Sequence, residues 1–395
     1  MSEPQVDLKK PVPTDKPKEE VKGLTDDALT KYQSAGHILA DVLKKFVPQV
    51  EIGKKVLDLC IEGDKLVAEA VAPLWNKSKN GVKIQKGLAF PTTISINNIV
   101  DHFSPLPSDP EVILQENDIV KIMLGVHIDG YAVTHAETIH LSSKTEGLSA
   151  DVIQAAYDGA QAAIRVLKAG AKNWEVTEVV DKVAKSYGCS AVEGMLSCQF
   201  EKDVTDGKKR ILLNPTPELK REHETCTFEE GEVYGVDILV VTGSDGKAKP
   251  DPSRTSIYKR GDISYQLKMK TSRAVFSEIQ KKAGAFPFNL RALEDEKRAR
   301  MGVHEAVTHG LLKPYDIVQT AVGTSVAQFF FTLALLPAGP LLLSPNPVWY
   351  AADKLSSSKS LEDEELKTLL TQPLRAPKKK KNKVGNGETK EETKA

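Results

Sequence analysis

The chain has 395 residues, a formal net charge of zero and four cysteines. That length is sufficient for a sizeable core and for more than one structural unit. A neutral chain exerts no global attraction on nucleic acid, so any such role requires a local excess of charge. The cysteines show no C-x-x-C spacing, which argues against a zinc ribbon or a disulfide framework and favours reduced thiols.

Residues 1–24 are polar and rich in proline, and they are predicted to be a flexible tail without a signal sequence. The most apolar run, residues 325–343, is interrupted by Gln, Thr, Pro and Gly. It is too short for a bilayer span, which needs about 20 apolar residues. Two strands around a turn at residues 337–340 fit it better, so we expect no membrane association.

The first half of the predicted fold consists of two helices, an extended segment and a hairpin. Thr25 is the expected N-cap of a helix that reaches Phe46, because apolar residues recur there at helical spacing. A second helix covers roughly residues 54–75, with a break at Gly63 as an open alternative. Residues 87–103 are extended and rich in turns.

Residues 121–141 are predicted to form the hairpin that organises the fold. β-Favouring residues fill both arms, and Asp-Gly stands at the bend. With the reversal centred between Ile128 and Asp129, Met123 is expected opposite Thr134, their Cβ atoms roughly 5 Å apart. Two carboxylates at this pair would hold metal ions, but the sequence has a thioether and a hydroxyl.

A second copy of this pattern begins about 120 residues later. Ser149 is the expected cap of a helix over residues 150–168, and another helix covers 173–187, with Gly188 as its stop. Strands are predicted at residues 190–199, 232–241 and 325–336. The duplication favours one large α/β domain with internal pseudo-symmetry around a shared cleft.

Residues 251–322 interrupt the second half and are predicted to be a basic, partly helical insert. Between residues 258 and 300, eleven Lys and Arg stand against five Asp and Glu. Five of these cations accompany two tyrosines in a short stretch, which suits phosphate contacts and stacking on exposed bases. The plainer alternative is a solvated surface. The candidate RNA-binding residues are Lys259, Arg260, Lys268, Lys270 and Arg273.

Residues 351–395 are predicted to form one short helix, at about 360–371, and a disordered tail. Leu366, Leu369 and Leu370 fit an L-x-x-L-L motif for docking in a partner's groove. We favour the alternative that they pack on the main domain. The tail has a lysine run suited to an RNA clamp, a nuclear address or both, formed by Lys378, Lys379, Lys380, Lys381 and Lys383.

Four blocks of the sequence resemble, in order, those of the type II methionine aminopeptidases. They are AFPTTISINNIVDHFSP (89–105), KIMLGVHIDG (121–130), EEGEVYGVDI (229–238) and AQFFFTLALL (327–336). The resemblance covers roughly residues 25–350, and the insert is similar to the family's helical insert. It implies the pita-bread fold, an α/β (α+β) architecture with pseudo-twofold helix-helix-hairpin halves around a central sheet.

A closer resemblance is to the proliferation-associated, ErbB-receptor-binding proteins. It rests on IYKR (257–260), EGMLS (193–197), LKMKTSRA (267–274), LRALEDEKRARMGV (290–303) and the lysine-rich tail. Those proteins are regarded as having the peptidase fold without peptidase activity. The resemblance implies binding to ribosomal RNA on the large ribosomal subunit near the nascent-chain exit, and to structured RNA. It also implies a cytoplasmic and nuclear or nucleolar location.

The active family holds two divalent metals with two Asp, one His and two Glu. Laying the blocks on one another places these ligands on Met123, Thr134, Met195, Asp237 and Phe330. Because four of the five are poor ligands for hard metals, the resemblance implies no metal, no cofactor and no catalytic residue. Without metals nothing lowers the pKa of an attacking water. His102 matches the family histidine that contacts substrate.

The polar remnants His102 and Asp237 either keep a binding pocket or satisfy local hydrogen bonds, the reading we favour. His127, expected at the turn, and His135, expected on the opposite face, are not expected to rebuild a metal site. Met123, Met195, Phe330 and Phe331 would either form an apolar ligand pocket or fill the space that the metals left.

Three functions stay open at this point. The first is a catalytically inactive protein that binds RNA and the large ribosomal subunit, in ribosome biogenesis, translation or growth regulation. The second is an active metalloaminopeptidase with a remodelled metal site. The third is a protein–protein scaffold or transcriptional coregulator that acts through the cleft or the C-terminal helix.

Overall fold

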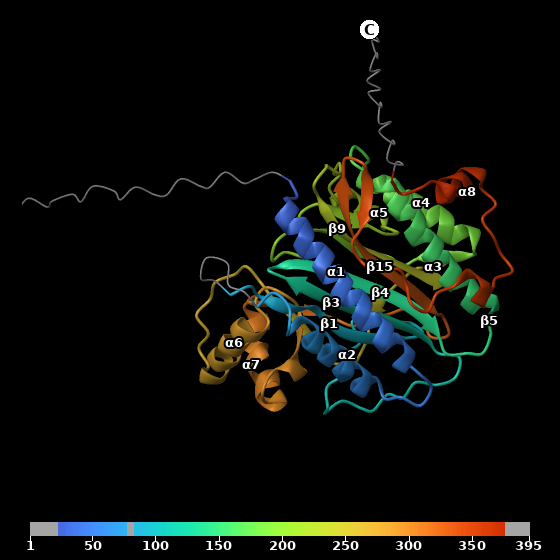
Figure 1. Ribbon diagram of the computed structural model, residues 1–395. Coiled ribbons are helices and arrows are strands. Elements are labelled where there is room, and N and C mark those ends of the chain that lie inside the picture. The colour runs from blue at the N-terminus through green and yellow to red at the C-terminus, as the bar shows by residue number, and fades with distance from the viewer. Residues whose placement is uncertain (1–22, 77–82, 376–395) are drawn as a thin grey trace, which may run out of the picture.

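The computed structural model describes residues 23–76 and 83–375. Within these residues a nine-stranded sheet forms the centre (Figure 1), with the strand order β1-β3-β4-β15-β9-β7-β8. β16 pairs with β15, and β6 pairs with β9. The strands are β1 (Lys86–Ile96), β3 (Ile119–Ile128), β4 (Tyr131–His140), β6 (Cys189–Ala191), β7 (Leu196–Phe200), β8 (Arg210–Leu212), β9 (Val233–Thr242), β15 (Val326–Leu336) and β16 (Gly339–Leu342).

Long helices cover one face of this sheet (Figure 1). The first pair packs on β1, β3 and β4, and the second pair packs on the half of the sheet that contains β9 and β15. This arrangement confirms the predicted pita-bread architecture with two related halves. The four helices are α1 (Asp26–Phe46), α2 (Val56–Val71), α3 (Gly147–Val166) and α4 (Asn173–Ser186).

Most helix boundaries follow from local chemistry. The Thr25 hydroxyl accepts a hydrogen bond from the backbone N–H of Ala28 at 3.2 Å, as expected of an N-cap. α2 runs without a break through Gly63, where a Cβ would overlap Thr92 of β1. The predicted cap at Ser149 is wrong, because α3 already begins at Gly147. The strand predicted at 190–199 is divided into β6 and β7 by a turn.

The hairpin of β3 and β4 has a different register from the one predicted. Met123 lies opposite Ala136, and Thr134 lies opposite Gly125. The loop is Asp129-Gly130, and both residues have positive φ, 53° and 85°. Such φ values are those of a two-residue type I′ turn, which the sequence favours with Asp-Gly. Because the shift is two residues, each side chain keeps its expected face.

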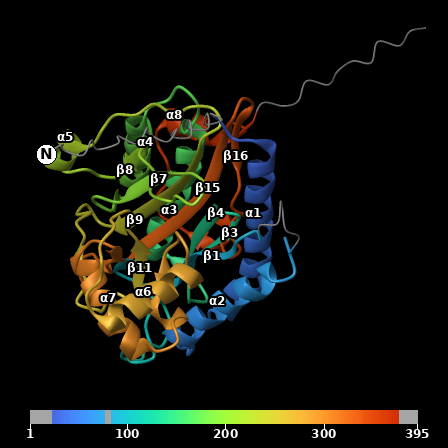
Figure 2. The ribbon, with the colours of Figure 1, turned by 90° about the vertical axis from the view of Figure 1, so that its left-hand side faces the viewer.

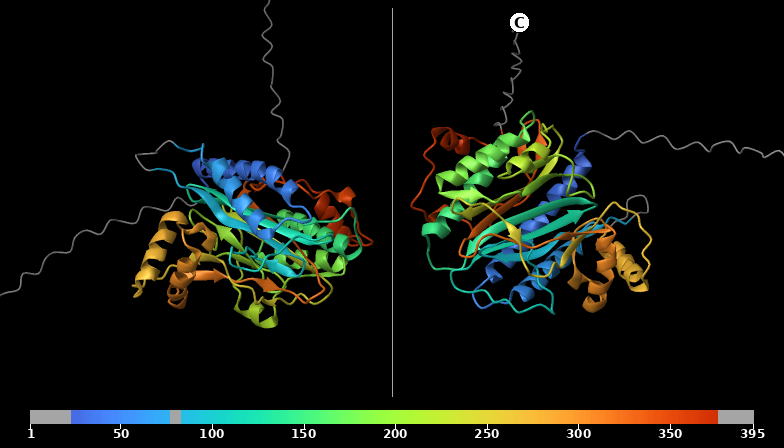
Figure 3. Two further views of the ribbon diagram at one scale, coloured as in Figure 1. Left: turned by 90° about the horizontal axis from the view of Figure 1, so that it is seen from below. Right: turned by 180° about the vertical axis from the view of Figure 1, so that it is seen from behind.

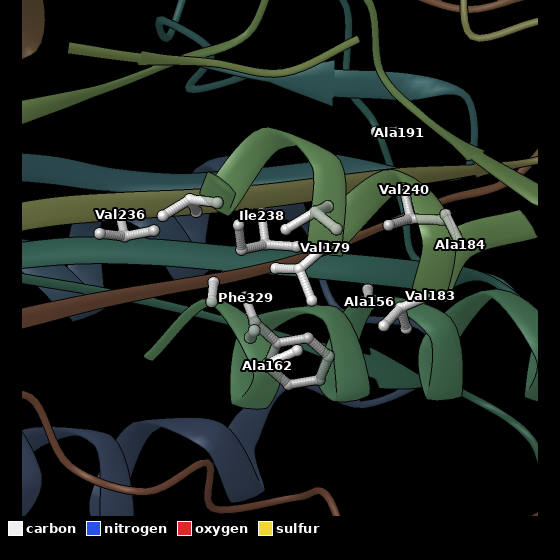
Figure 4. Packing of buried hydrophobic residues seen from close by; sticks show 14 of the residues in the cluster. Ala156, Ala162, Val179, Val183, Ala184, Ala191, Val236, Ile238, Val240 and Phe329 are labelled. Atoms are coloured by element: carbon white, nitrogen blue, oxygen red, sulfur yellow. The ribbon is translucent and has the colours of Figure 1, made fainter. Parts of the chain in front are cut away.

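The core lies between the helices and the sheet. On β9, Val236, Ile238 and Val240 are fully buried and point toward α3 and α4. Figure 4 shows them in one cluster with Phe329 of β15 and Val179 of α4. Alternation along the strands then directs the residues between them, such as Asp237, to the opposite face of the sheet.

The insert is a mixed unit and not only helical. α6 (Lys270–Lys282) and α7 (Glu296–Thr308) pack together beside a small sheet (Figure 2). That sheet has the order β12-β11-β13, with β12 (Phe288–Asn289), β11 (Ile257–Arg260) and β13 (Leu312–Tyr315). η2 (Leu290–Ala292) joins it to α7. A second small sheet has the order β10 (Lys249–Pro250), β14 (Val318–Gln319) and β2 (Ile99–Asp101).

An arginine fastens the insert to the main domain. One Nη of Arg291 lies 2.7 Å from Oδ2 of Asp64 in α2, and the other lies 2.7 Å from Oγ of Ser104. The Arg291 side chain is almost fully buried. In the view from behind (Figure 3, right), α6 and α7, in orange, lie beside the sheet, and α1, in blue, lies behind it.

The C-terminal helix α8 (Glu364–Thr371) packs on α3. Leu366 is 5% exposed, and Leu369 and Leu370 pack against the same core. The leucines of the L-x-x-L-L motif thus pack on their own domain, as in the alternative that the sequence analysis favoured. No helix in the described ranges has the length and apolar character needed to cross a membrane. The remaining short elements are η1 (Val47–Gln49), β5 (Thr145–Glu146), α5 (Pro217–Glu222), η3 (Ala352–Lys354) and β17 (Leu355–Ser356).

Candidate functional site

A cavity of about 290 Å³ lies on the face of the sheet away from α1 and α3. Strands from both halves contribute to its lining, as the pseudo-symmetric fold predicts. The structure brings together in this lining the five positions that the resemblance gave for the former metal ligands and the predicted pocket remnant His102. The five positions are Met123, Thr134, Met195, Asp237 and Phe330.

Strand register explains how these residues meet. Phe330 of β15 lies opposite both Asp237 of β9 and Ala136 of β4. Ala136 in turn lies opposite Met123 of β3, and Thr134 is two residues away on the same face. The side chains therefore form a row across four neighbouring strands, although the predicted facing pair is diagonal.

Gln328 and Asp101 belong to the site and were missed by the sequence analysis. Nε2 of Gln328 lies 2.9 and 3.1 Å from the two carboxylate oxygens of Asp237, and 3.1 Å from Oδ2 of Asp101. Burial, and then the charge of Asp101, raise the pKa of Asp237 well above its usual range. Their positions in the sequence could have indicated them, because Gln328 stands two residues before Phe330 and Asp101 directly precedes His102.

A buried lysine stands behind these carboxylates. Lys121 is 1% exposed, and its Nζ donates to the carbonyl oxygens of Asn97 at 2.8 Å and Val326 at 3.1 Å. Burial lowers the pKa of Lys121 to about 7. The polar floor of the cavity is therefore held together by hydrogen bonds within the protein.

His102 has a local hydrogen-bond partner at Nδ1 and an acidic neighbour at Nε2. Nδ1 lies 3.2 Å from the carbonyl oxygen of Asp316, and Nε2 lies 3.4 Å from Oδ2 of Asp101. Its φ of 67° is unusual for a residue with a side chain and points to a constrained backbone. His102 and Asp237 thus match the favoured alternative, in which local hydrogen bonds satisfy the remnants.

Cys198 also lines the cavity and was not predicted. It lies on β7 opposite Gly235, two residues from Asp237, whereas Met195 lies in the turn that precedes β7. Burial raises the pKa of the Cys198 thiol to about 11, so at neutral pH it is protonated and a poor nucleophile.

Three neighbouring residues test further expectations, which His135 fits and His127 does not. His127 is not at the turn but in β3 opposite Ala132, and its ring stacks on Phe286 of the insert at 4.2 Å. His135 is buried on the other face, as predicted, with Nε2 3.5 Å from Glu137. Phe331 is excluded from the cavity, because it packs into the core under α3.

The predicted RNA-binding residues of the insert fall into two groups. Lys259 is 5% exposed and its Nζ lies 2.6 Å from Asp206, while Arg260 donates to the carbonyl of Gly284 at 3.3 Å. Lys259 is therefore a buried residue held in an ion pair, which corrects its prediction as an exposed RNA-binding cation. Arg260 is half-buried. Lys268, Lys270 and Arg273 are exposed at the start of α6. The run at residues 378–383 lies outside the described residues.

Comparison with known proteins identifies the fold family. The model of metallopeptidase family M24 matches residues 30–249, more than half of the chain. The chain belongs to metallopeptidase family M24.

Three relatives place it in one branch of M24. "Curved DNA-binding protein" of Schizosaccharomyces pombe is 45% identical over 358 residues, covering 90% of this chain and 92% of the relative. "ERBB-3 BINDING PROTEIN 1" of Solanum tuberosum is 42% identical over 374 residues, covering 93% and 94%. "Proliferation-associated protein A" of Dictyostelium discoideum is 37% identical over 360 residues, covering 89% and 90%. The predicted relationship to the proliferation-associated, ErbB-receptor-binding proteins is confirmed.

Solved structures of other proteins have the same fold. A thermophilic Arx1 aligns with a TM-score of 0.82 and 31% identity, covering 90% of this chain and 100% of that one. A methionine aminopeptidase of Thermotoga maritima aligns with a TM-score of 0.53 and 16% identity, covering 82% and 98%, which supports the fold alone.

Membership of a metallopeptidase family implies a metal centre, but the donor set of this M24 protein does not fit one. Met123, Thr134 and Phe330 supply no carboxylate or imidazole, and hard divalent cations need several such ligands. The Asp237 carboxylate already faces an amide N–H₂ donor of Gln328, which is where a cation would bind. Within residues 23–76 and 83–375, no three His, Cys, Asp or Glu side chains converge as a metal site.

Proposed function

We propose that this M24 protein is a non-peptidase that binds structured RNA, including ribosomal RNA of the large subunit near the nascent-chain exit. It would act in ribosome biogenesis, translation or growth regulation, in the cytoplasm and in the nucleus or nucleolus. The peptidase fold would then serve as the scaffold that presents a basic insert.

The absence of peptidase activity is supported by the chemistry of the cavity. Hydrolysis in a metallopeptidase needs a metal that lowers the pKa of water toward neutrality. Gln328, Met123 and Phe330 offer an amide, a thioether and a phenyl ring at the positions that face Asp237. The Cys198 thiol, with its raised pKa, offers no replacement nucleophile.

The observation that carries RNA binding is the exposed cationic start of α6. Lys268 and Lys270 are exposed, and within the described chain neither side chain has an ion-pair partner. Arg273 shares this surface, and its Nη1 donates to the carbonyl oxygens of Leu267 and Lys268. Unpaired exposed cations are the groups that phosphates attract. The S. pombe relative is named for binding DNA, a polyanion of the same kind.

Ribosome co-sedimentation across a salt series tests this assignment. We expect the double variant Lys268→Glu and Lys270→Glu to bind more weakly. The slope of log affinity against log salt should fall by about one for each phosphate that the protein no longer neutralises. The matched control is Lys168→Glu with Lys182→Glu, two exposed lysines on the α3 and α4 side of the molecule. Equal binding by both double variants would remove α6 from the contact surface.

A metal-binding and peptidase assay tests the proposed absence of peptidase activity. We expect purified protein to bind no stoichiometric cobalt, manganese or zinc in the cavity and to leave Met-Ala peptides intact. Robust turnover that depends on one of these metals would favour the alternative of a remodelled aminopeptidase.

A further inference from the structure

We propose that the cavity is a binding site for a methylated ammonium group, of the kind carried by choline or by a trimethylated lysine. This goes beyond the proposed function, because it gives the former peptidase cavity a ligand of its own. The inference rests on the rings, the charges and the size of the cavity.

The rings form the first part of the argument. Phe90, His102 and Tyr315 meet in a three-ring cluster at one wall, with centroid distances of 5.9 Å, 5.5 Å and 5.1 Å. Phe200 and Phe330 line the cavity from β7 and β15, with centroids 6.4 Å apart. Several aromatic rings around one small space bind quaternary ammonium groups, because ring faces are electron-rich.

The charges form the second part. Asp101, Asp206 and Asp237 line the cavity, and no Lys or Arg among residues 23–76 and 83–375 does. Lys259 neutralises Asp206 at 2.6 Å. Asp101 and Asp237 are the lining acids without a cationic partner at this distance, and they share the Gln328 amide as their hydrogen-bond donor. Lys121 lies behind them, but its Nζ is directed to two backbone carbonyls. The lining therefore favours a cation over an anion or a neutral group.

Size and wall chemistry select the kind of cation. A space of about 290 Å³ holds a trimethylammonium group and a short stem. Thioethers of Met123 and Met195 are polarizable and suit methyl groups. A small inorganic cation or a primary ammonium would have to give up strongly bound water for these walls, whereas methylation removes the N–H donors that hold such water.

Calorimetric titration of the full chain with choline and with its neutral carbon isostere, 3,3-dimethylbutan-1-ol, tests the proposal without any mutation. The two probes have the same shape and differ in charge. We expect choline to bind at least about fivefold more tightly, as an aromatic cage with carboxylates requires. Equal affinity for the two probes, or no binding of choline at millimolar concentration, would overturn the proposal.

Variants that lack one aromatic ring test whether choline binds in this cavity. We expect Tyr315→Leu and Phe330→Leu each to weaken choline binding by about threefold to tenfold. The matched control is Tyr265→Leu, which removes a ring that stacks on His309 in the insert, away from the cavity. Near-ultraviolet circular dichroism confirms folding of each variant. If choline binds all three variants and the wild type equally, the cavity is not the site.

A second titration distinguishes the two sources of the group. A short peptide with trimethyllysine is compared with the same peptide carrying unmodified lysine. Preference for the methylated peptide, abolished in Phe330→Leu, assigns a modified protein as the ligand. Binding of choline without binding of the peptide assigns a free small molecule. Preference for unmodified lysine would overturn the role of methylation.

Discussion

The side-chain amide of Gln328 covers the carboxylate of Asp237, with Nε2 at 2.9 and 3.1 Å from the two oxygens. The same nitrogen reaches Asp101 at 3.1 Å, so one amide links two buried acids that would otherwise repel each other. This arrangement places a hydrogen-bond donor between the two acids at the floor of the cavity.

Replacing that donor should create a need for a cation. Gln328→Glu places a third carboxyl group beside Asp101 and Asp237, and we expect the free energy of unfolding at neutral pH to fall by about 2–4 kcal/mol. Manganese should then raise the melting temperature of the variant, because a divalent cation offsets the repulsion. Gln328→Met is the control without added charge. The same manganese response in wild-type protein would mean that the native donor set binds metal.

Lys259 and Lys270 should behave differently, although both belong to the basic insert. Lys259→Met leaves the partly exposed Asp206 without its partner at 2.6 Å, so urea unfolding should show a stability decrease of about 1–2 kcal/mol. Lys270→Met should change stability by less than about 0.5 kcal/mol but weaken RNA binding. An equal decrease in both variants would contradict the separation into structural and exposed cations.

The hairpin turn should tolerate no side chain at Gly130. Its φ is 85°, and a Cβ there would overlap the Asp203 carboxylate. Gly130→Ala should therefore destabilise the protein by about 1–3 kcal/mol, from backbone strain and from displacement of Asp203. Gly170 has a φ of 90° with open space around it, so Gly170→Ala measures the strain alone. Similar destabilisation in the two variants would show that Asp203 moves freely.

Acidification should weaken the contact between His127 and the insert. Burial lowers the pKa of His127 from its ordinary 6.5 to about 4. The unfolded chain then binds a proton below pH 6.5 that the folded chain does not, so stability falls as the pH drops from about 6.5 to about 4, by up to roughly 3 kcal/mol. Urea unfolding of His127→Gln should show a smaller decrease over this range. The exposed His37→Gln is the control, and parallel profiles for all three proteins would contradict the assignment.

The sequence predicted the faces of the strands better than the contacts between them. Alternation placed Met123 and Thr134 on one face, and the family blocks assigned Asp237 and Phe330 to the same site. In the structure all four line one cavity. The facing pair was wrong because Asp129 adopts a positive φ and the loop is centred one residue later than expected.

Contacts between residues that are far apart in the sequence could not be predicted from it. Asp101 and Gln328 are 227 positions apart, and no local pattern shows that they share a hydrogen bond. Lys259 was predicted to be a free cation because the sequence around it has more Lys and Arg than Asp and Glu. Only the fold of the small sheet brings Asp206, 53 positions away, against it.

The buried bond between Arg291 and Asp64 would affect the proposed RNA binding through entropy. A flexible basic segment gives up conformational freedom when it binds, and that entropy subtracts from its affinity. Here the insert is already fixed to α2, so the spacing between Lys268, Lys270 and Arg273 is largely set before any ligand arrives. If this surface binds RNA as proposed, such preorganisation would make it selective for phosphates at a matching spacing, whereas a loose cationic chain would accept any polyanion.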